Sequence, residues 1–207
     1  MGVLEDKTRA RYFYKYLSKV YDRVNSFIFT EPMRDRAISM LDLQGEEAVL
    51  DVGCGTGFGT EGLLAHTDDV VGVDQSPHQL SKARERLVID EEVTFTMGDA
   101  ERLPFRTDSF DAAWSSGSIE YWPNPVTGLR EMRRVVKPGG TVVVVGPNYP
   151  DSRIMQAVAD AIMLFYTVEE IDEMFGEAGY EDVDHEILGS KYWSDPAIAS
   201  VGTVPRD

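Results

Sequence analysis

From residue 48 onward, short apolar runs alternate with longer segments in which apolar residues recur at the spacing of an amphipathic helix. Ser76 and Asn124 each precede a proline, and they predict the N-terminal caps of helices that end near Val88 and Val136. Strand–helix alternation of this kind is typical of a largely parallel sheet with helices on both faces. The apolar runs predict five strands, at residues 48–52, 70–73, 93–97, 110–114 and 141–146.

The segments around this core extend the pattern. The stretch KPGG, at residues 137–140, predicts the end of a helix and a turn into the next strand. Thr167 and Glu170 have the spacing of a capping box, which predicts a helix that reaches about Ala178. We expect amphipathic helices in residues 1–45 and two final strands, one of them antiparallel, within residues 180–188 and 191–203.

Length and composition favour one domain with a substantial core. The chain has 207 residues, of which 43% are hydrophobic, as in ordinary globular proteins. Cys54 is the single cysteine, which excludes an internal disulfide and a multi-cysteine metal site. We expect no metal site, because three histidines also fail to cluster in the sequence: His66, His78 and His185.

Charge and hydropathy restrict the partners and the location. The formal net charge of −16 argues against nucleic acid as a partner, because a phosphate-binding face is normally basic. This charge favours adaptation to concentrated salt, where screening weakens self-repulsion; the alternative is an ordinary acidic protein kept soluble by its charge. No apolar run approaches the roughly 18 residues of a membrane span, and the N-terminus is charged where a signal peptide is apolar. We therefore expect a cytoplasmic protein.

A glycine-rich turn leaves the first predicted strand, in the stretch VLDVGCGTGFG at residues 49–59. Gly53, Gly55 and Gly57 let the backbone turn tightly and approach a ligand without interference from Cβ atoms. In an open parallel sheet, this turn borders the ligand site beyond the carboxyl ends of the strands. Asp74 ends the second predicted strand about 20 residues further on, where an acidic residue can bind ribose hydroxyl groups.

Two positions in the turn bear on the kind of cofactor. The dinucleotide fingerprint requires a glycine at its sixth position, where this chain has Phe58. Asp51 stands two residues before the first glycine, where a carboxylate would repel a pyrophosphate and attract a cationic amino acid. This combination favours S-adenosylmethionine. The alternatives are a nicotinamide-dependent oxidoreductase and a glycine-rich turn that binds no ligand.

Four motifs resemble those of class I methyltransferases that use S-adenosylmethionine: DVGCGTG, the strand ending in Asp74, GDAERLPF and RVVKPGG. The resemblance implies an α/β, Rossmann-like class I methyltransferase fold, with a mostly parallel seven-stranded sheet and helices on both faces. It also implies that the methionine amino group lies beside the glycine loop. The other cofactor contacts implied are Asp74 at the ribose, Gln75, Asp99 and Ala100 at the adenine, and Ser115 at the methionine end.

The stretch SSGSIEYWPNP, at residues 115–125, has unusual apolar bulk for a loop that follows a strand. In it, Ile119, Tyr121 and Trp122 surround one carboxylate, Glu120. Either another part of the chain covers this aromatic loop, or the loop receives an apolar ligand.

A closer resemblance is to methyltransferases of prenylated quinols, and it rests on residues 16–37, 70–85, 117–125 and 159–170. Plastid members of that family carry a transit segment and a membrane anchor, and we expect neither in this chain. The resemblance implies C-methylation of a prenylated quinol ring, of menaquinone or benzoquinol type. The alternative is an N- or O-methyltransferase of a soluble small molecule.

Ring methylation requires a base, and Glu120 is our candidate. The quinol hydroxyl must lose its proton so that electron density reaches the ortho carbon, and a positioned base contributes about 10²–10⁴-fold. Tyr121 and Trp122 would desolvate Glu120, raise its pKa and form one wall of the quinol pocket. Alternatively, Glu120 caps a helix or only hydrogen-bonds the substrate. Related ubiquinone and menaquinone enzymes have an arginine in this loop where this chain has Ile119, so their mechanism is not carried over.

Two further segments complete the expected site. By resemblance, Tyr21 lies near the sulfonium group as a second catalytic candidate, the alternative being a core aromatic residue. Residues 154–166 are apolar on most sides, and we expect Met155 and Met163 to line the prenyl tail unless this segment is simply core. A lipid substrate implies peripheral contact with a membrane. The single domain then comprises an N-terminal helical lid (1–45), a cofactor-binding core (46–150), and substrate-covering helices with the final strands (151–207).

Overall fold

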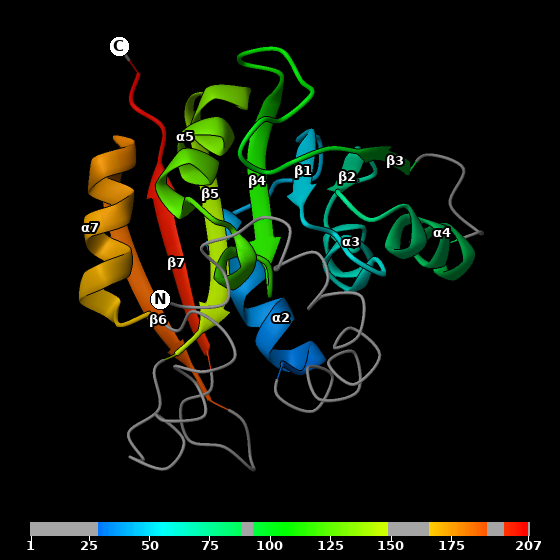
Figure 1. Ribbon diagram of the computed structural model, residues 1–207, viewed down its shortest axis with the longest axis horizontal. Helices are drawn as coiled ribbons and strands as arrows, with labels where there is room; N and C mark the ends of the chain where they lie inside the picture. Colours follow the sequence, from blue (N-terminus) through cyan, green and yellow to red (C-terminus); the bar gives the residue numbers. More distant parts are fainter. Residues whose placement is uncertain (1–28, 88–92, 149–165, 190–196, 207) are drawn as a thin grey trace.

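The computed structural model describes residues 29–87, 93–148, 166–189 and 197–206. A seven-stranded sheet forms its centre, in the order β3-β2-β1-β4-β5-β7-β6 (Figure 1). Neighbouring strands are parallel except at β7, which runs antiparallel to β5 and β6. The mostly parallel sheet and its single antiparallel strand are therefore confirmed. The strands are β1 (Val49–Val52), β2 (Val70–Asp74), β3 (Thr94–Met97), β4 (Phe110–Ser116), β5 (Val136–Pro147), β6 (Glu181–Leu188) and β7 (Ala197–Thr203).

The helices begin where the sequence predicted their caps. Ser76 and Asn124 accept hydrogen bonds from backbone amides in the first turns of α4 and α5. Thr167 and Glu170 make both hydrogen bonds of the capping box at the start of α7. The helices are α2 (Glu31–Ile38), α3 (Phe58–Leu63), α4 (Pro77–Arg86), α5 (Pro125–Val135) and α7 (Val168–Ala178), with 3-10 turns η2 (Ser39–Leu41) and η3 (Ile119–Tyr121).

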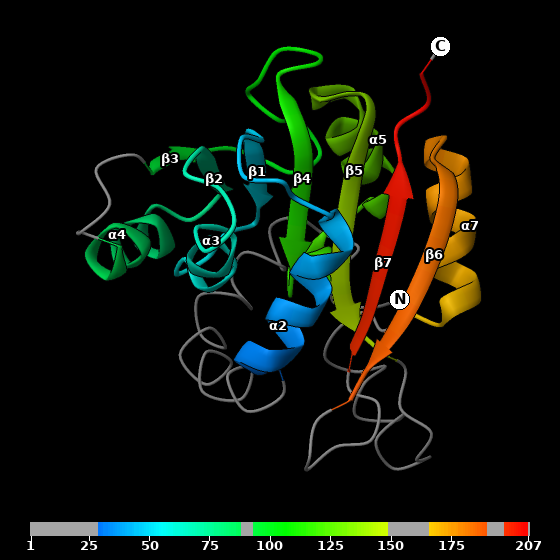
Figure 2. The same cartoon turned by 180° about the vertical axis from the view of Figure 1, so that it is seen from behind.

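Apolar side chains cover both faces of the sheet. On the face turned to the viewer in Figure 1, α5 and α7 bury Leu129 and Phe175. On the opposite face, seen in Figure 2, α2 and α3 bury Ile38 and Leu63. Residues 142–145 of β5 alternate between the two apolar clusters and are all buried. Burial on both faces explains why the central strands read as continuous apolar runs.

The strand β5 begins earlier than the sequence indicated. Val136 already pairs with Phe110, and the register shifts before Thr141 pairs with Ala112. The predicted turn at residues 137–140 is therefore an irregularity within the strand. The Gly139 amide stabilises it by donating to the Val204 carbonyl at 2.8 Å.

Some predicted segments lie outside the described residues: most of the N-terminal lid, residues 154–165 of the apolar segment, and residues 191–196 of the last predicted strand. Within the described part of the chain, no helix has the length and apolar character needed to span a membrane. The assignment to the cytoplasm and the membrane contact stay predictions.

Candidate functional site

The parallel strands β1, β2 and β4 end at one edge of the sheet, and the glycine loop turns there. Gly53, Gly55 and Gly57 have φ angles of 70°, 53° and 84°, in the left-handed region that favours glycine. The amides of Gly53 and Cys54 both donate to the Val73 carbonyl, at 2.8 and 3.1 Å. These bonds hold the loop against the end of β2.

Asp74 is the last residue of β2, and its side chain binds the backbone of the glycine loop. Its carboxylate accepts hydrogen bonds from the Gly55 amide at 3.0 Å and the Ser76 amide at 2.7 Å. Burial raises the pKa of Asp74, and these two hydrogen bonds oppose that rise. A carboxylate has about four acceptor positions, so Asp74 retains capacity to bind ribose hydroxyl groups. The ribose contact itself stays a prediction.

Asp51 anchors the first helix after the loop. It is 1% exposed, and its carboxylate accepts a hydrogen bond from the Thr60 hydroxyl of α3 at 2.6 Å. Burial raises the pKa of Asp51 to about 7, and the nearby charge of Asp74 contributes to the rise. The expected contact between Asp51 and the amino group of a cofactor stays a prediction.

The residues expected at the adenine follow β2 and β3. Gln75 and Asp99 are exposed, and Ala100 is half-buried. Asp99 accepts a hydrogen bond from the Glu101 amide at 3.0 Å, which shapes the turn after β3. Because β2 and β3 are parallel neighbours, these residues lie at the same edge of the sheet as Asp74. Their contact with adenine is not tested by this arrangement and stays a prediction.

The aromatic loop after β4 is largely covered by the chain itself. Glu120 is fully buried, and Trp122 is 6% exposed. The Trp122 indole N–H donates to the Ser118 hydroxyl at 3.0 Å, and its ring lies against Gly128 of α5, where a Cβ atom would collide with it. Packing on α5 therefore accounts for the bulk of Trp122, while its contact with a quinol stays a prediction.

Ser118 joins the aromatic loop to the glycine loop. A Cβ atom on Gly53 would lie 2.6 Å from the Ser118 Cβ, so only glycine leaves room for this contact. The small residues of the stretch SSGS were the signal for this close approach in the sequence, which did not indicate the partner. Tyr121, next to Glu120, is half-buried, and its role as a substrate contact stays a prediction.

Ser115 and Tyr166 bury hydroxyl groups that have no hydrogen-bond partner among the described residues. Ser115 lies near the end of β4 and is 0% exposed, and Tyr166 is 8% exposed. Tyr166 forms a β-bridge with Asn148, just beyond β5. Burial raises the pKa of Tyr166, and the negative charge of Glu120 raises it further. The sequence had indicated Tyr166 only as the end of an apolar segment.

Three predicted site residues lie outside the described residues: Tyr21, Met155 and Met163. The second catalytic candidate and the methionine wall for a prenyl tail therefore stay predictions.

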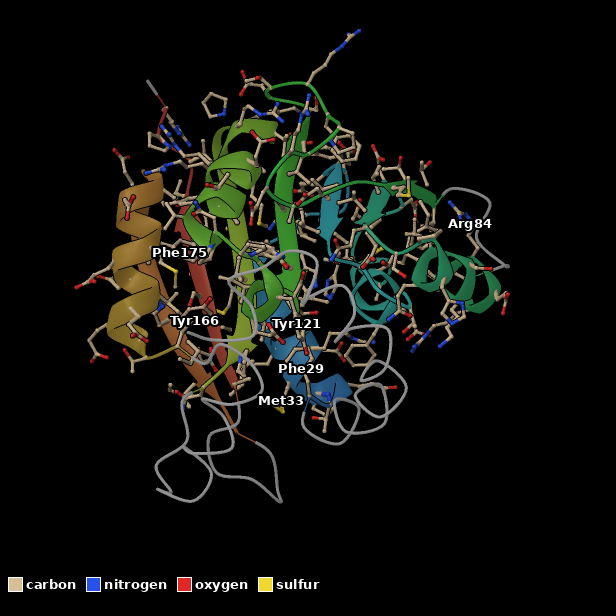
Figure 3. All side chains as sticks on the ribbon, in the orientation of Figure 1. Phe29, Met33, Arg84, Tyr121, Tyr166 and Phe175 are labelled. Carbon is tan, nitrogen blue, oxygen red and sulfur yellow. The ribbon has the colours of Figure 1, made fainter. Side chains whose placement is uncertain are left out.

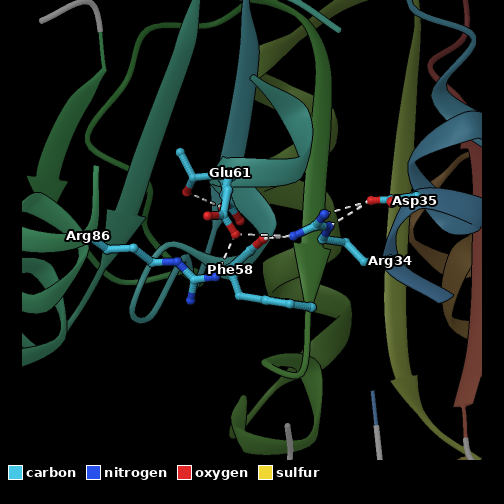
Figure 4. Close-up of polar contacts among 7 residues, drawn as sticks. Arg34, Asp35, Phe58, Glu61 and Arg86 are labelled. Carbon is cyan, nitrogen blue, oxygen red and sulfur yellow. Dashed lines mark hydrogen bonds and ion pairs between the residues drawn. The ribbon is translucent and has the colours of Figure 1, made fainter. Parts of the chain in front are cut away.

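Around Phe58, at the start of α3, two arginines gather (Figure 4). The guanidinium carbons of Arg34 and Arg86 lie 4.7 and 5.8 Å from the centre of the Phe58 ring. Both guanidinium groups also reach the Glu61 carboxylate, at 3.4 and 2.5 Å. The cluster ties α2, α3 and α4 together next to the glycine loop. Arg34 and Arg86 are too far from α3 in the chain for local sequence patterns to indicate the cluster.

Comparison with known families agrees with this geometry. A family model described as a methyltransferase domain matches residues 50–144, which contain the glycine loop, Asp74 and Glu120. Residues 50–144 are thus matched by a methyltransferase domain, and the sheet that they form has the Rossmann-like fold of such domains. A putative methyltransferase, solved in complex with the Haloferax volcanii Trm112 methyltransferase activator, has the same fold, with a TM-score of 0.78 and 22% identity. That alignment covers 93% of this chain and 97% of the other.

Two curated methyltransferases are similar in sequence. The 2-methyl-6-phytyl-1,4-hydroquinone methyltransferase 1 of Oryza sativa subsp. japonica is 45% identical over 92% of this chain and 58% of its own length. The demethylmenaquinone methyltransferase of Staphylococcus aureus (strain JH9) is 34% identical over 70% of this chain and 63% of its own length. The chain thus spans less than two thirds of either relative.

Proposed function

We propose that this chain transfers a methyl group from S-adenosylmethionine to a ring carbon of a prenylated quinol, of menaquinone or benzoquinol type. The observation that carries the proposal is the fully buried carboxylate of Glu120, in a loop that touches the glycine loop through Ser118. The similarity to a phytyl-hydroquinone methyltransferase over 92% of the chain supports this class of acceptor.

The residues at the sheet edge suit S-adenosylmethionine. Gly53 and Gly55 have left-handed backbone and no Cβ atoms, so a ligand can approach the backbone closely. Asp74 lies beside this turn and has free acceptor positions on its carboxylate. The buried hydroxyl of Ser115 has no partner in the described part of the chain and is available to the methionine end. When bound, this cofactor supplies an electrophilic methyl group and accepts the electron pair of the broken carbon–sulfur bond.

Glu120 is the base in this proposal. It takes the proton from one quinol hydroxyl, and the electron density moves to the ortho carbon, which forms the new bond to the methyl group. That carbon then loses its own proton to solvent, and the ring regains aromaticity as a phenolate. The phenolate takes back the proton held by Glu120, so one proton is released overall. Burial of Glu120 keeps water from competing for the carboxylate, and holding the two reactants in line contributes much of the remaining rate.

The test is transfer of labelled methyl from S-adenosylmethionine to chemically reduced prenylated quinols in molar salt, with the product identified by mass. We expect label in a ring-methylated quinol. Absence of transfer to reduced benzoquinol and naphthoquinol acceptors would refute the proposed acceptor class. Label in a soluble amine or alcohol would then identify the N- or O-methyltransferase alternative.

We also propose peripheral contact with a membrane, because a prenylated quinol partitions into the bilayer. Co-sedimentation with liposomes at the working salt concentration tests it. Protein that stays in the supernatant while it methylates quinols in those liposomes would contradict lasting contact.

A further inference from the structure

Tyr166 is placed at the same edge of the sheet as Glu120. The β-bridge with Asn148 and the hydrogen bond from the Tyr166 amide to the Pro147 carbonyl fix it just beyond the carboxyl end of β5. The aromatic loop lies against the same strand end, because a Cβ on Gly146 would lie 2.9 Å from a methyl carbon of Ile119. Figure 3 shows Tyr166 and Tyr121 of the aromatic loop at this end of the sheet.

The hydroxyl of Tyr166, like that of Ser115, lacks a hydrogen-bond partner in the described part of the chain. It is also buried. A buried polar group without a partner destabilises a protein, and native structures contain few of them. Phenylalanine would fill the same space without that penalty, so the hydroxyl calls for a partner other than the residues that the structure describes.

The surroundings define what that partner must be. The nearby negative charge of Glu120 and the buried position both favour the protonated phenol, which is a hydrogen-bond donor. A ligand group suited to this donor is therefore an oxygen that becomes electron-rich beside Glu120. The ring oxygen of a quinol is such a group, since it develops negative charge as its proton leaves.

We propose that Tyr166 is a substrate-binding residue whose hydroxyl donates a hydrogen bond to the quinol oxygen that Glu120 deprotonates. This inference rests on the proposed function and adds a residue and a contact to it. Tyr166 keeps its own proton throughout, while the quinol proton passes to Glu120. A hydrogen bond that strengthens as the oxygen becomes negative stabilises the transition state more than the bound substrate.

The experiment compares Tyr166→Phe with Tyr180→Phe. Tyr180 is a matched control, because it is also buried, but its hydroxyl donates to the Leu129 carbonyl at 2.8 Å. We expect Tyr166→Phe to lower kcat/KM for the quinol by about ten- to hundredfold, as for loss of a hydrogen bond to a charged group. Its S-adenosylmethionine affinity should stay unchanged, and its melting temperature should stay equal or rise. Tyr180→Phe should instead lower the melting temperature and leave kcat/KM within about twofold, because it removes a satisfied internal hydrogen bond.

Two quinol analogues, each lacking one ring oxygen, test the contact itself. We expect Tyr166→Phe to weaken inhibition by the analogue that keeps the contacted oxygen and to leave the inhibition constant of the other unchanged. Equal weakening for both analogues would overturn a direct contact. An unchanged kcat/KM in Tyr166→Phe, or a loss that accompanies a lower melting temperature, would also overturn the inference while leaving the proposed function intact. Failure of the unsubstituted protein to methylate any quinol would overturn both.

Discussion

The buried carboxyl of Asp51 should make the stability of this protein depend on pH. Its pKa is raised from 3.8 to about 7, chiefly by burial. Between these values the folded state binds more protons than the unfolded state, so Asp51 lowers the free energy of unfolding as pH rises through this window. Above about pH 7 the carboxyl is ionised in both states, and its destabilising effect no longer changes with pH.

The substitution Asp51→Asn isolates this effect. Asparagine keeps an oxygen that can accept the hydrogen bond from Thr60, but it carries no charge. Each pH unit inside the window corresponds to about 1.4 kcal/mol. The effect operates between pH 5 and the folded-state pKa of about 7, which is an interval of two pH units. The free energy of unfolding of Asp51→Asn, relative to that of the unsubstituted protein, should therefore increase by about 3 kcal/mol between pH 5 and pH 8.

Urea unfolding of both proteins at pH 5 and pH 8 measures this difference, and other titrating groups cancel in the comparison. Asp68→Asn is the control, because Asp68 is exposed, and its relative stability should be the same at both pH values. A relative stability of Asp51→Asn that does not change between pH 5 and pH 8 would refute the reasoning. It would show that the pKa of Asp51 is the same in the folded and unfolded states, because solvent or hydrogen bonds in the folded protein stabilise the ionised carboxylate as well as water does in the unfolded chain.

Three other predictions follow from the site and the charge. Glu120→Gln should lower kcat for methyl transfer at least about tenfold without changing S-adenosylmethionine affinity by calorimetry, and an unchanged kcat would remove Glu120 from the mechanism. Gly53→Ala should destabilise the protein more than Gly55→Ala in urea unfolding, because both need left-handed backbone (about 1–2 kcal/mol) but only the first Cβ meets Ser118. Equal losses would argue that this contact relaxes freely. The net charge of −16 predicts a higher melting temperature in molar salt than in dilute buffer, and equal temperatures would count against adaptation to salt.

Local chemistry allowed the sequence to determine much of the fold. The caps at Ser76, Asn124 and Thr167 act within one turn of helix, so short patterns sufficed to locate three helix starts. The glycine loop and Asp74 were recognisable because their backbone and side-chain requirements recur at fixed spacing along one strand–turn–helix–strand unit. The position of the antiparallel strand required the sheet itself, since pairing between β5 and β7 joins residues far apart in the chain.

The environment of the site was decided by the tertiary structure alone. The sequence showed an acid among aromatic residues in residues 115–125, but only packing on α5 shows that Trp122 is covered by the chain itself. Tyr166 read as the end of an apolar segment, and its place at the same end of the sheet as Glu120 depends on how the chain returns to β5. Residue type and spacing thus determined which groups the protein has available. Long-range packing decided which of these groups are buried and which are in contact. It also left the Tyr166 hydroxyl without a partner among the described residues.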